Sequence, residues 1–289
     1  MLLPENSNFT RHIAREIRDC HVRPQVVLAP ASFAQVQAAV RLLAKHRQSF
    51  AVLGGGHDVR CGSSSDQVVL SLRQMAALEL NQEERSLTFE GGVLSIDVLR
   101  ALRDTGFSAV TGGCPTVGMT GFVLGGGYSD IASNLFGLGA ANVLAARVVL
   151  ASGRLVLATR HNQHRDLLWA LMGGGGGKIG VVVQVKYKIH KIARFQFASG
   201  VIQIPESKRP LVSQLFADWT RLVRTQFPLH SGSHLLSMED GSVQKYHFES
   251  MCVHCDWQAL YAPLLHKCRN FFQSVNFTES SFYENYLRE

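Results

Sequence analysis

Three clusters of glycine constrain this chain more than any other feature of its sequence. Of the 26 glycines, 23 lie between Gly54 and Gly180. Glycine lets a backbone approach a ligand closely and adopt positive φ, and successive amide groups form concave sites for phosphate. The sequence therefore predicts loops that hold a ligand such as a pyrophosphate. The clusters are Gly54-Gly55-Gly56-His57, the stretch from Gly112 to Tyr128, and Gly173 to Gly177 followed by Gly180.

The two common phosphate-binding motifs do not account for these clusters. A P-loop would need glycine where Met172 stands and serine or threonine where Ile179 stands, and it would follow a strand and open a helix. A Rossmann motif fails because the first cluster leads into Arg60-Cys61-Gly62-Ser63, where no helix is expected. We therefore expect a phosphate site of a different kind.

Composition and charge exclude several classes of protein. The 289 residues are 46% hydrophobic and 18% charged, which excludes an intrinsically disordered chain. Residues 201–289 carry 8 basic and 9 acidic side chains, so the net charge of +7 leaves +8 on residues 1–200. A basic half attracts anionic ligands. Without a basic run or a recognition motif, nucleic acid is the weakest candidate.

No targeting or membrane segment is visible in the sequence. Residues 1–18 alternate polar and charged side chains, unlike a signal peptide. The most apolar stretch, Val143 to Ala158, contains Arg147 and Arg154 and is too interrupted to span a bilayer. The sequence leaves the location unassigned: it would be cytoplasmic unless the N-terminus is incomplete. We expect no membrane partner, and the oligomeric state is not indicated.

Periodicity predicts a mixed α+β fold for the first two thirds of the chain. Ser32 is expected to cap a helix with Gln35 as its partner, and Ser95 to cap another. A hairpin is expected to turn at Ser152-Gly153, and a helix over 164–172 is expected to bury Trp169. The predicted strands are 26–28, 50–53, 68–72, 87–90, 143–150, 154–158 and 181–189.

The sequence pattern changes near Ala193 and predicts a second domain. Strands are expected over 195–204 and 243–253, the latter reached by a hairpin turn at Asp240-Gly241. Helices are expected over 211–222 and 260–271, which makes two helices and about three strands. We therefore divide the chain into a domain at 1–194, with its core at 24–192, and a partial domain at 195–289.

The six cysteines do not form the pattern of a disulfide framework. They are widely spread, and Cys252-Val-His-Cys255 is a single C-x-x-C pair with no second pair nearby. We expect ordinary buried cysteines. The histidines form no pair with metal-ligand spacing beside a carboxylate, so no metal site is expected.

The glycine clusters together resemble a known family. The motifs are G-G-G-H at 54–57, C-P-T-V-G at 114–118, G-G-G-Y at 125–128 and the run that closes on Gly180-Val181-Val182. In this order and spacing they are similar to the berberine bridge enzyme-like FAD-linked oxidases, within the wider vanillyl-alcohol oxidase/p-cresol methylhydroxylase family. The resemblance implies an FAD-binding unit of two subdomains, followed by a substrate domain with an antiparallel sheet and helices on one face.

The resemblance also implies that FAD is bound through two covalent bonds. His57 matches the histidine bonded to the flavin 8α-methyl carbon, and Cys114 matches the cysteine bonded to flavin C6. A neutral imidazole and a thiolate are both nucleophiles suited to such bonds. The further cofactor-binding positions implied by the motifs are Gly54, Gly55, Gly56, Asp58, Gly113, Thr116, Val117, Gly118, Gly121, Gly126, Gly127, Tyr128, Gly180 and Val182.

The family's chemistry implies an oxidase. Hydride from an alcohol, sugar or amine-type carbon would pass to flavin N5 while a base removes a proton. O2 would then reoxidise the flavin, and Val117 matches the small residue found where oxygen reaches the ring. The implied partners are a small-molecule substrate and O2.

Family members continue well beyond the length of this chain, and their later part supplies the catalytic base. The base is therefore left unassigned, and the alternative function is a truncated, non-catalytic FAD-binding protein. Tyr283-Glu284-Asn285-Tyr286 is similar to the family's returning segment but comes too early, so a substrate-domain helix is expected there. The alternatives for the two attachment residues are a surface-loop histidine for His57 and a buried structural thiol for Cys114.

Overall fold

The computed structural model describes most of the first two thirds of the chain and four strands beyond it. The described residues are 1–16, 20–129, 132–174, 176–192, 195–205, 210, 214, 217–218, 221, 230–239, 243–252, 262, 266 and 272–280. The chain divides into two compact units, which are described separately. Unit 1 comprises Met1–Arg103, Phe107–Ser129 and Phe136–Lys191, and unit 2 comprises Asp104–Gly106, Asp130–Leu135 and Ile192–Glu289.

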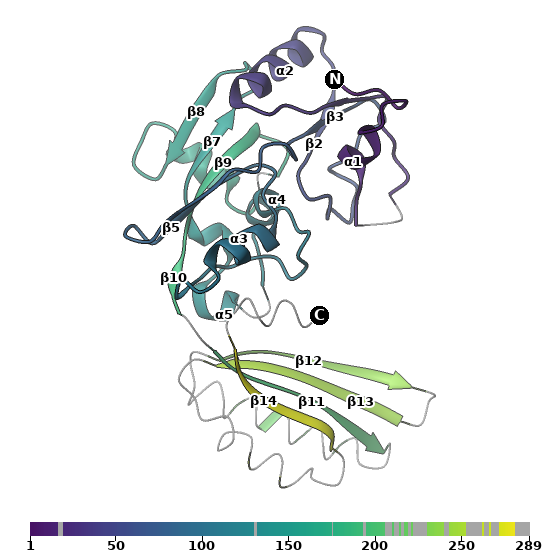
Figure 1. The fold of residues 1–289 in the computed structure, drawn as a ribbon, viewed down its shortest axis with the longest axis vertical. Coiled ribbons are helices and arrows are strands. Elements are labelled where there is room, and N and C mark those ends of the chain that lie inside the picture. The colour runs from purple at the N-terminus through teal and green to yellow at the C-terminus, as the bar shows by residue number, and fades with distance from the viewer. Residues whose placement is uncertain are drawn as a thin grey trace. The chain divides into compact units, whose positions relative to one another are not determined.

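Unit 1 begins with a small parallel sheet in the order β1-β3-β2, of which Figure 1 labels β2 and β3. Its strands are β1 (Val26–Leu28), β2 (Phe50–Leu53) and β3 (Val68–Ser71), and the helices α1 (Phe9–Ile13) and α2 (Phe33–Lys45) pack beside it. Ser32 caps α2 as predicted, since its side chain accepts a hydrogen bond from the amide of Gln35 at 3.3 Å. The first glycine cluster follows β2 directly.

A five-stranded antiparallel sheet in the order β4-β5-β9-β7-β8 forms the other half of unit 1. Its strands are β4 (Leu78–Asn81), β5 (Ser86–Glu90), β7 (Val143–Val149), β8 (Leu155–Thr159) and β9 (Val181–Lys188). The helices α3 (Ser95–Leu102), α4 (Met119–Leu124) and α6 (Arg165–Leu171) pack on this sheet through one apolar core. Short elements complete the unit: β6 (Phe107–Ser108), η1 (Gly139–Asn142) and β10 (His190–Lys191). Of α5 (Ser133–Phe136), only Phe136 belongs to unit 1.

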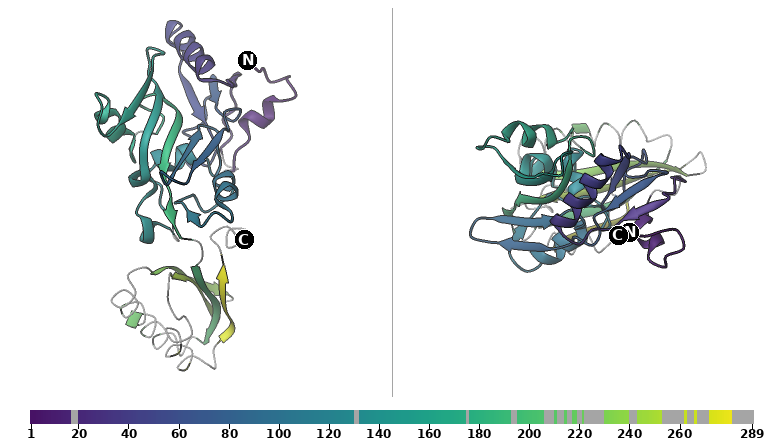
Figure 2. Two further views of the ribbon diagram at one scale, coloured as in Figure 1. Left: turned by 60° about the vertical axis from the view of Figure 1, so that its left-hand side comes forward. Right: turned by 90° about the horizontal axis from the view of Figure 1, so that it is seen from above.

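The two sheets of unit 1 share an apolar core with α2, and Figure 2 shows the ribbon of α2 beside both sheets. Val36 and Val40 of α2 are buried against Leu70 of the parallel sheet and against Val149 and Val183 of the antiparallel sheet. Burial of such side chains stabilises a fold by about 1.5–3 kcal/mol each. The loops that leave the two sheets are therefore held in a fixed relation to each other.

The structure corrects several sequence predictions within unit 1. Ser95 is the first residue of α3 and does not cap it; the capping contact is made by Asp97, whose carboxylate accepts from the amide of Leu94 at 3.0 Å. Trp169 is 76% exposed, because Leu168 and Leu171 are the residues of α6 that face the core. Strand β4 was not predicted. The hairpin at Ser152-Gly153 is confirmed, with Gly153 at φ +76°.

Unit 2 contains a four-stranded antiparallel sheet in the order β12-β13-β11-β14. Its strands are β11 (Phe195–Pro205), β12 (His230–Glu239), β13 (Val243–Cys252) and β14 (Phe272–Ser280). About three strands were predicted, and β14 is the one that was missed. The turn at 240–241, most of the two predicted helices, the Cys255 end of the C-x-x-C pair and the 283–286 segment lie outside the described residues.

Candidate functional site

The first glycine cluster forms a tight loop at the end of β2. Gly56 is buried and has φ +86°, a conformation that favours glycine. The amides of Gly55, Gly56 and His57 find no acceptor among the described residues. A buried amide without a partner costs free energy. The loop therefore presents a row of donors suited to an anionic ligand.

Arg73 fixes this loop by hydrogen bonds to its backbone carbonyls. The sequence analysis did not identify Arg73 as a site residue. Its guanidinium donates to the carbonyl oxygens of Gly54 at 3.0 Å and Gly55 at 3.1 Å, and to that of Ala14 at 2.5 Å. It also donates to the carbonyl of Arg11. Arg73 thus engages carbonyl oxygens of the loop and leaves its amides without a partner from this side chain. Arg73 follows β3 by two residues, but no sequence motif marks it.

The second cluster presents Cys114, Thr116 and Val117 in a turn that is fixed by α3. The amide of Ser95 donates to the carbonyl of Val117 at 2.8 Å, and the amide of Ile96 donates to that of Pro115 at 3.0 Å. The amide of Val117 closes the turn on the carbonyl of Cys114 at 3.1 Å. Cys114 is a free, exposed thiol, so the alternative of a buried structural cysteine is wrong.

The first two clusters meet backbone to backbone. A Cβ on Gly55 would overlap the amide nitrogen of Gly118 and would lie 2.6 Å from the carbonyl oxygen of Thr116. Across this contact, His57 Nε2 lies 2.8 Å from Thr116 Oγ1. Burial lowers the pKa of His57, and the charge of Glu16 acts in the opposite direction. Burial therefore favours the neutral form of the His57 imidazole, whose Nε2 is held by the hydroxyl of Thr116.

The G-G-G-Y turn and the third cluster lie together beside α4. Gly126 and Gly127 have φ of +104° and +73°, and the carbonyls of both accept hydrogen bonds from η1. A Cβ on Gly173 would lie 3.6 Å from the Cα of Gly126. Tyr128, one of the expected cofactor-binding positions, is 63% exposed. Gly113, Gly121 and Gly126 have open space where a Cβ would stand.

Val182 lies within β9, and Gly180 stands directly before the first residue of that strand. A Cβ on Gly180 would lie 2.9 Å from the carbonyl oxygen of Val149, and the side chain of Val182 is 3% exposed. The carbonyl of Val182 nevertheless approaches Gly91, whose own carbonyl is 3.2 Å from where a Cβ of Gly54 would stand. Gly91 thus packs between the start of β9 and the first glycine loop. Gly92, the next residue, is packed equally closely against neighbouring backbone.

Asp58 folds back on its own turn. Its carboxylate accepts from the amide of Arg60 at 2.8 Å, and its carbonyl accepts from that of Cys61 at 3.1 Å. A Cβ on Gly62 would overlap this carboxylate. The role of Asp58 in this structure is to shape the segment that follows His57.

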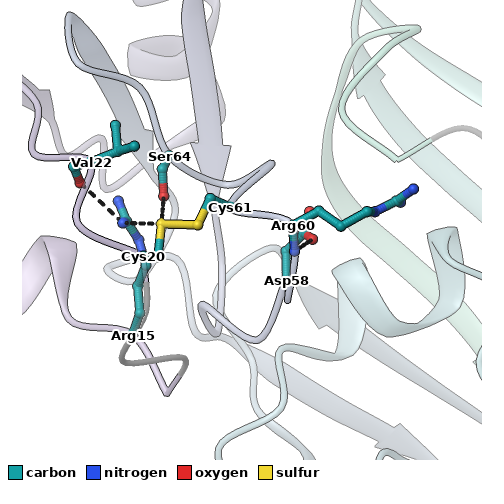
Figure 3. Close-up of a disulfide and its surroundings, with 7 residues drawn as sticks. All are labelled: Arg15, Cys20, Val22, Asp58, Arg60, Cys61 and Ser64. Atoms are coloured by element: carbon teal, nitrogen blue, oxygen red, sulfur yellow. Dashed lines mark hydrogen bonds between the residues drawn. A yellow bond between two sulfur atoms is a disulfide. The ribbon is translucent and has the colours of Figure 1, made fainter.

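A disulfide joins Cys20 to Cys61 (Figure 3). The prediction of ordinary buried cysteines is wrong for this pair, because their separation of 41 positions in sequence hides their proximity in the fold. Arg15 donates to Cys20 Sγ at 3.0 Å and to the carbonyl of Val22 at 3.1 Å. Ser64 Oγ lies 3.3 Å from the same sulfur. The bridge ties the N-terminal segment to the turn after His57.

Among the described residues, no group of three or more histidine, cysteine, aspartate or glutamate side chains lies close enough to hold a metal ion. Within the same residues, no helix is long and apolar enough to cross a membrane.

Comparisons with known proteins agree with this geometry. Residues 24–159 match the model of an FAD binding domain. The chain is 37% identical over 180 residues to FAD-linked oxidoreductase easE of Aspergillus fumigatus, covering 58% of this chain and 28% of the relative. It is 34% identical over 206 residues to berberine bridge enzyme-like D-1 of Nicotiana tabacum, covering 68% of this chain and 35% of the relative.

Solved structures share the fold at lower sequence identity. The 6-hydroxy-D-nicotine oxidase of Arthrobacter nicotinovorans aligns with a TM-score of 0.85 at 22% identity, over 99% of this chain and 62% of the oxidase. A variant of berberine bridge enzyme aligns with a TM-score of 0.85 at 19% identity, over 100% of this chain and 59% of the enzyme.

The fold and the glycine-lined site define a flavoprotein with an α+β FAD-binding unit of the vanillyl-alcohol oxidase/p-cresol methylhydroxylase type. More closely, residues 24–159 match an FAD binding domain, and the chain is a homologue of berberine bridge enzyme-like and other FAD-linked oxidoreductases. It spans about a third of the length of the curated relatives it matches.

The residues of the site fit FAD. The amides of Gly55, Gly56 and His57 have no acceptor among the described residues, and backbone amides of this kind bind phosphate oxygens. The buried hydroxyl of Thr120, in the second cluster, also has no partner among the described residues. His57 and Cys114 are nucleophiles presented by the two loops that meet at Gly55 and Gly118.

Proposed function

We propose that this protein is an FAD-dependent oxidase that holds its flavin through His57 and Cys114. The observation that carries the proposal is the contact between the first two glycine loops. One loop carries the imidazole of His57, whose neutral form is favoured by burial. The adjoining turn carries the free thiol of Cys114. When bound, FAD takes up hydride from the substrate and passes the electrons to O2. The proposed substrate is a small molecule oxidised at an alcohol, sugar or amine-type carbon.

The chain's own residues have separate tasks in this proposal. Arg73 holds the carbonyls of Gly54 and Gly55, and the amides of the first loop would bind the phosphates of FAD. His57 supplies a lone pair because it is neutral. Cys114 supplies a sulfur nucleophile from an exposed position. Two attachments would prevent loss of the cofactor between turnovers, which suits an acceptor as small as O2.

Flavin retention after denaturation tests the attachment. Purified protein is run on a denaturing gel under ultraviolet light, together with His57→Ala, Cys114→Ala and the double variant. Each single variant should keep fluorescent flavin on the protein, and the double variant should lose it. Release of all flavin from the unmodified protein into the acid supernatant would contradict covalent attachment while leaving FAD binding intact.

Peroxide production and reoxidation test the oxidase assignment. Val117 is half-buried, and its Cγ1 lies 2.5 Å from where a Cβ of Gly112 would stand. Val117→Leu should therefore crowd this position and slow reoxidation of reduced flavin by O2, with flavin reduction nearly unchanged. Stopped-flow absorbance measures both steps. A protein that keeps its flavin but produces no peroxide with any alcohol, sugar or amine would instead be a non-catalytic FAD-binding protein.

A further inference from the structure

The hydroxyl of Thr116 is the one side-chain partner of His57 among the described residues. Its Oγ1 lies 2.8 Å from His57 Nε2, within the range of a good hydrogen bond. The ring's other nitrogen, Nδ1, has no partner there. One nitrogen of the imidazole is thus engaged by the protein, and the other is left for a ligand.

Both members of this pair are held by backbone contacts that do not depend on them. The turn that carries Thr116 is fixed by hydrogen bonds from the start of α3 to Pro115 and Val117. The loop that carries His57 is fixed by Arg73 through the carbonyls of Gly54 and Gly55. The pair is therefore preorganised, and removing the hydroxyl should leave both backbones in place.

The tautomeric state of a neutral histidine decides which of its two ring nitrogens can act as a nucleophile. The nitrogen that carries the proton has no lone pair to offer, and the hydrogen bond made by one nitrogen sets the state of the other. When Thr116 Oγ1 accepts from Nε2–H, Nδ1 carries the lone pair. Burial lowers the pKa of His57 and so favours the neutral ring.

We infer that Thr116 is a positioning residue for flavin attachment: it holds the proton of His57 on Nε2 and so directs Nδ1 at the flavin 8α-methyl carbon. This inference rests on the proposed attachment of FAD to His57. In the step, an Nδ1–carbon bond forms and a methyl carbon–hydrogen bond breaks. The methyl proton and the Nε2 proton are both lost, two protons and the electron pair are taken up by the flavin, and O2 reoxidises the ring to give hydrogen peroxide.

The hydrogen bond has a second consequence during bond formation. Positive charge develops on the imidazole as Nδ1 gives up its lone pair, and it is shared with Nε2–H. An oxygen acceptor at Nε2 stabilises that charge more than it stabilises the neutral ring, because hydrogen bonds from charged donors are about twice as strong. Thr116 is thus expected to affect the rate of attachment more than the affinity for FAD.

The test uses the full chain with Cys114→Ala, so that His57 is the attachment residue measured. Apoprotein is mixed with FAD, and the covalent fraction is followed by in-gel fluorescence and by the mass of the flavin-bearing peptide. Adding Thr116→Val removes the hydroxyl at nearly constant volume and should slow attachment by at least tenfold. Adding Thr116→Ser should restore most of the rate. Thr88→Val on β5 is the matched control and should change nothing.

A second readout separates this inference from the proposed function. Nitrogen chemical shifts of His57 in the apoprotein report its tautomer, and Thr116→Val should lower the population protonated at Nε2. Equal attachment rates with and without Thr116→Val would overturn the inference and leave attachment standing. If the Cys114→Ala protein attaches no flavin, both the proposed His57 bond and the role of Thr116 in attachment are wrong. A dependence of the Nε2 tautomer on Thr116 would then still show that Thr116 orients the His57 ring.

Discussion

Gly55 and Gly118 pack so closely that neither position has room for a side chain. Gly55 belongs to the loop that follows the parallel sheet, and Gly118 belongs to the turn in front of α4. This contact is where the two halves of unit 1 bring His57 and Thr116 together. The glycines here are required by the close approach of two backbones, and Gly55 does not have a positive φ.

Gly55→Ala should separate the two loops. The new methyl group would overlap Gly118, so the backbones must move apart at a cost on the order of 1–3 kcal/mol. We expect a lower Tm and much slower flavin attachment. Differential scanning fluorimetry measures the first and gel fluorescence the second. Gly174→Ala, where a Cβ meets no atom within 4 Å, controls for the general effect of alanine on Tm.

Arg73→Lys should loosen the first glycine loop without removing its charge. Lysine cannot reproduce the planar arrangement that reaches several carbonyls at once, and each lost hydrogen bond to a charged donor is worth about 1.5–3 kcal/mol. We expect a lower free energy of unfolding and a lower covalent flavin fraction, measured by urea titration and gel fluorescence. Arg100→Lys, on the exposed side of α3, is the matched control. Equal stability of the two variants would show that Arg73 does not hold the loop.

Reduction of the Cys20–Cys61 disulfide should lower the stability of unit 1. The bridge closes a loop of 41 residues, and such a crosslink stabilises a fold by roughly 2–4 kcal/mol. Tm should therefore fall on addition of a thiol reductant, and the double variant Cys20→Ser, Cys61→Ser should start from the lower Tm and be insensitive to reductant. A reductant effect of equal size in the double variant would place the sensitive bond elsewhere.

His190 should make the protein less stable in mild acid. Burial, and secondly the charge of Lys188, lower its pKa from 6.5 to about 4. The folded protein thus resists a proton that the unfolded chain accepts, so the free energy of unfolding should fall as the pH drops from about 6.5 to about 4. The neutral ring is held by Asn142 Oδ1 at 2.8 Å and stacks on Phe136 at 4.2 Å.

His190→Gln keeps a hydrogen-bonding side chain but does not titrate. Stability measured from pH 7.5 to 4 should lose part of its slope in this variant. Burial also lowers the pKa of His12, but His12 is unchanged in both proteins, so the difference between the two curves isolates His190. Parallel curves would mean that His190 does not contribute to the pH dependence.

Local patterns predicted the fold of unit 1 well. Alternating or continuous apolar runs gave β2, β7 and β9, and the serine at position 32 marked the start of α2. Strand β4 was missed because Leu78–Asn81 alternates half-buried and exposed residues at the edge of the sheet. Its polar side chains resemble those of a loop.

The site was less predictable because its contacts join distant parts of the chain. The glycine clusters pointed to the right loops, and the resemblance named His57 and Cys114. Arg73 binds backbone carbonyls, which any sequence provides, so no residue pattern marks its partners. The disulfide pairs two cysteines that are 41 residues apart, and only the folded chain shows them to be neighbours.

The division of the site between two sheets has a thermodynamic consequence. A ligand that touches both halves stabilises their association by RT ln(1 + [L]/Kd), so the stability of a reversible holoprotein depends on the concentration of free cofactor. A covalent bond removes that dependence, because the ligand can no longer be diluted away. Folding around FAD would then act as a one-way step, and a molecule that had once acquired its cofactor would keep the added stability even where free FAD is scarce.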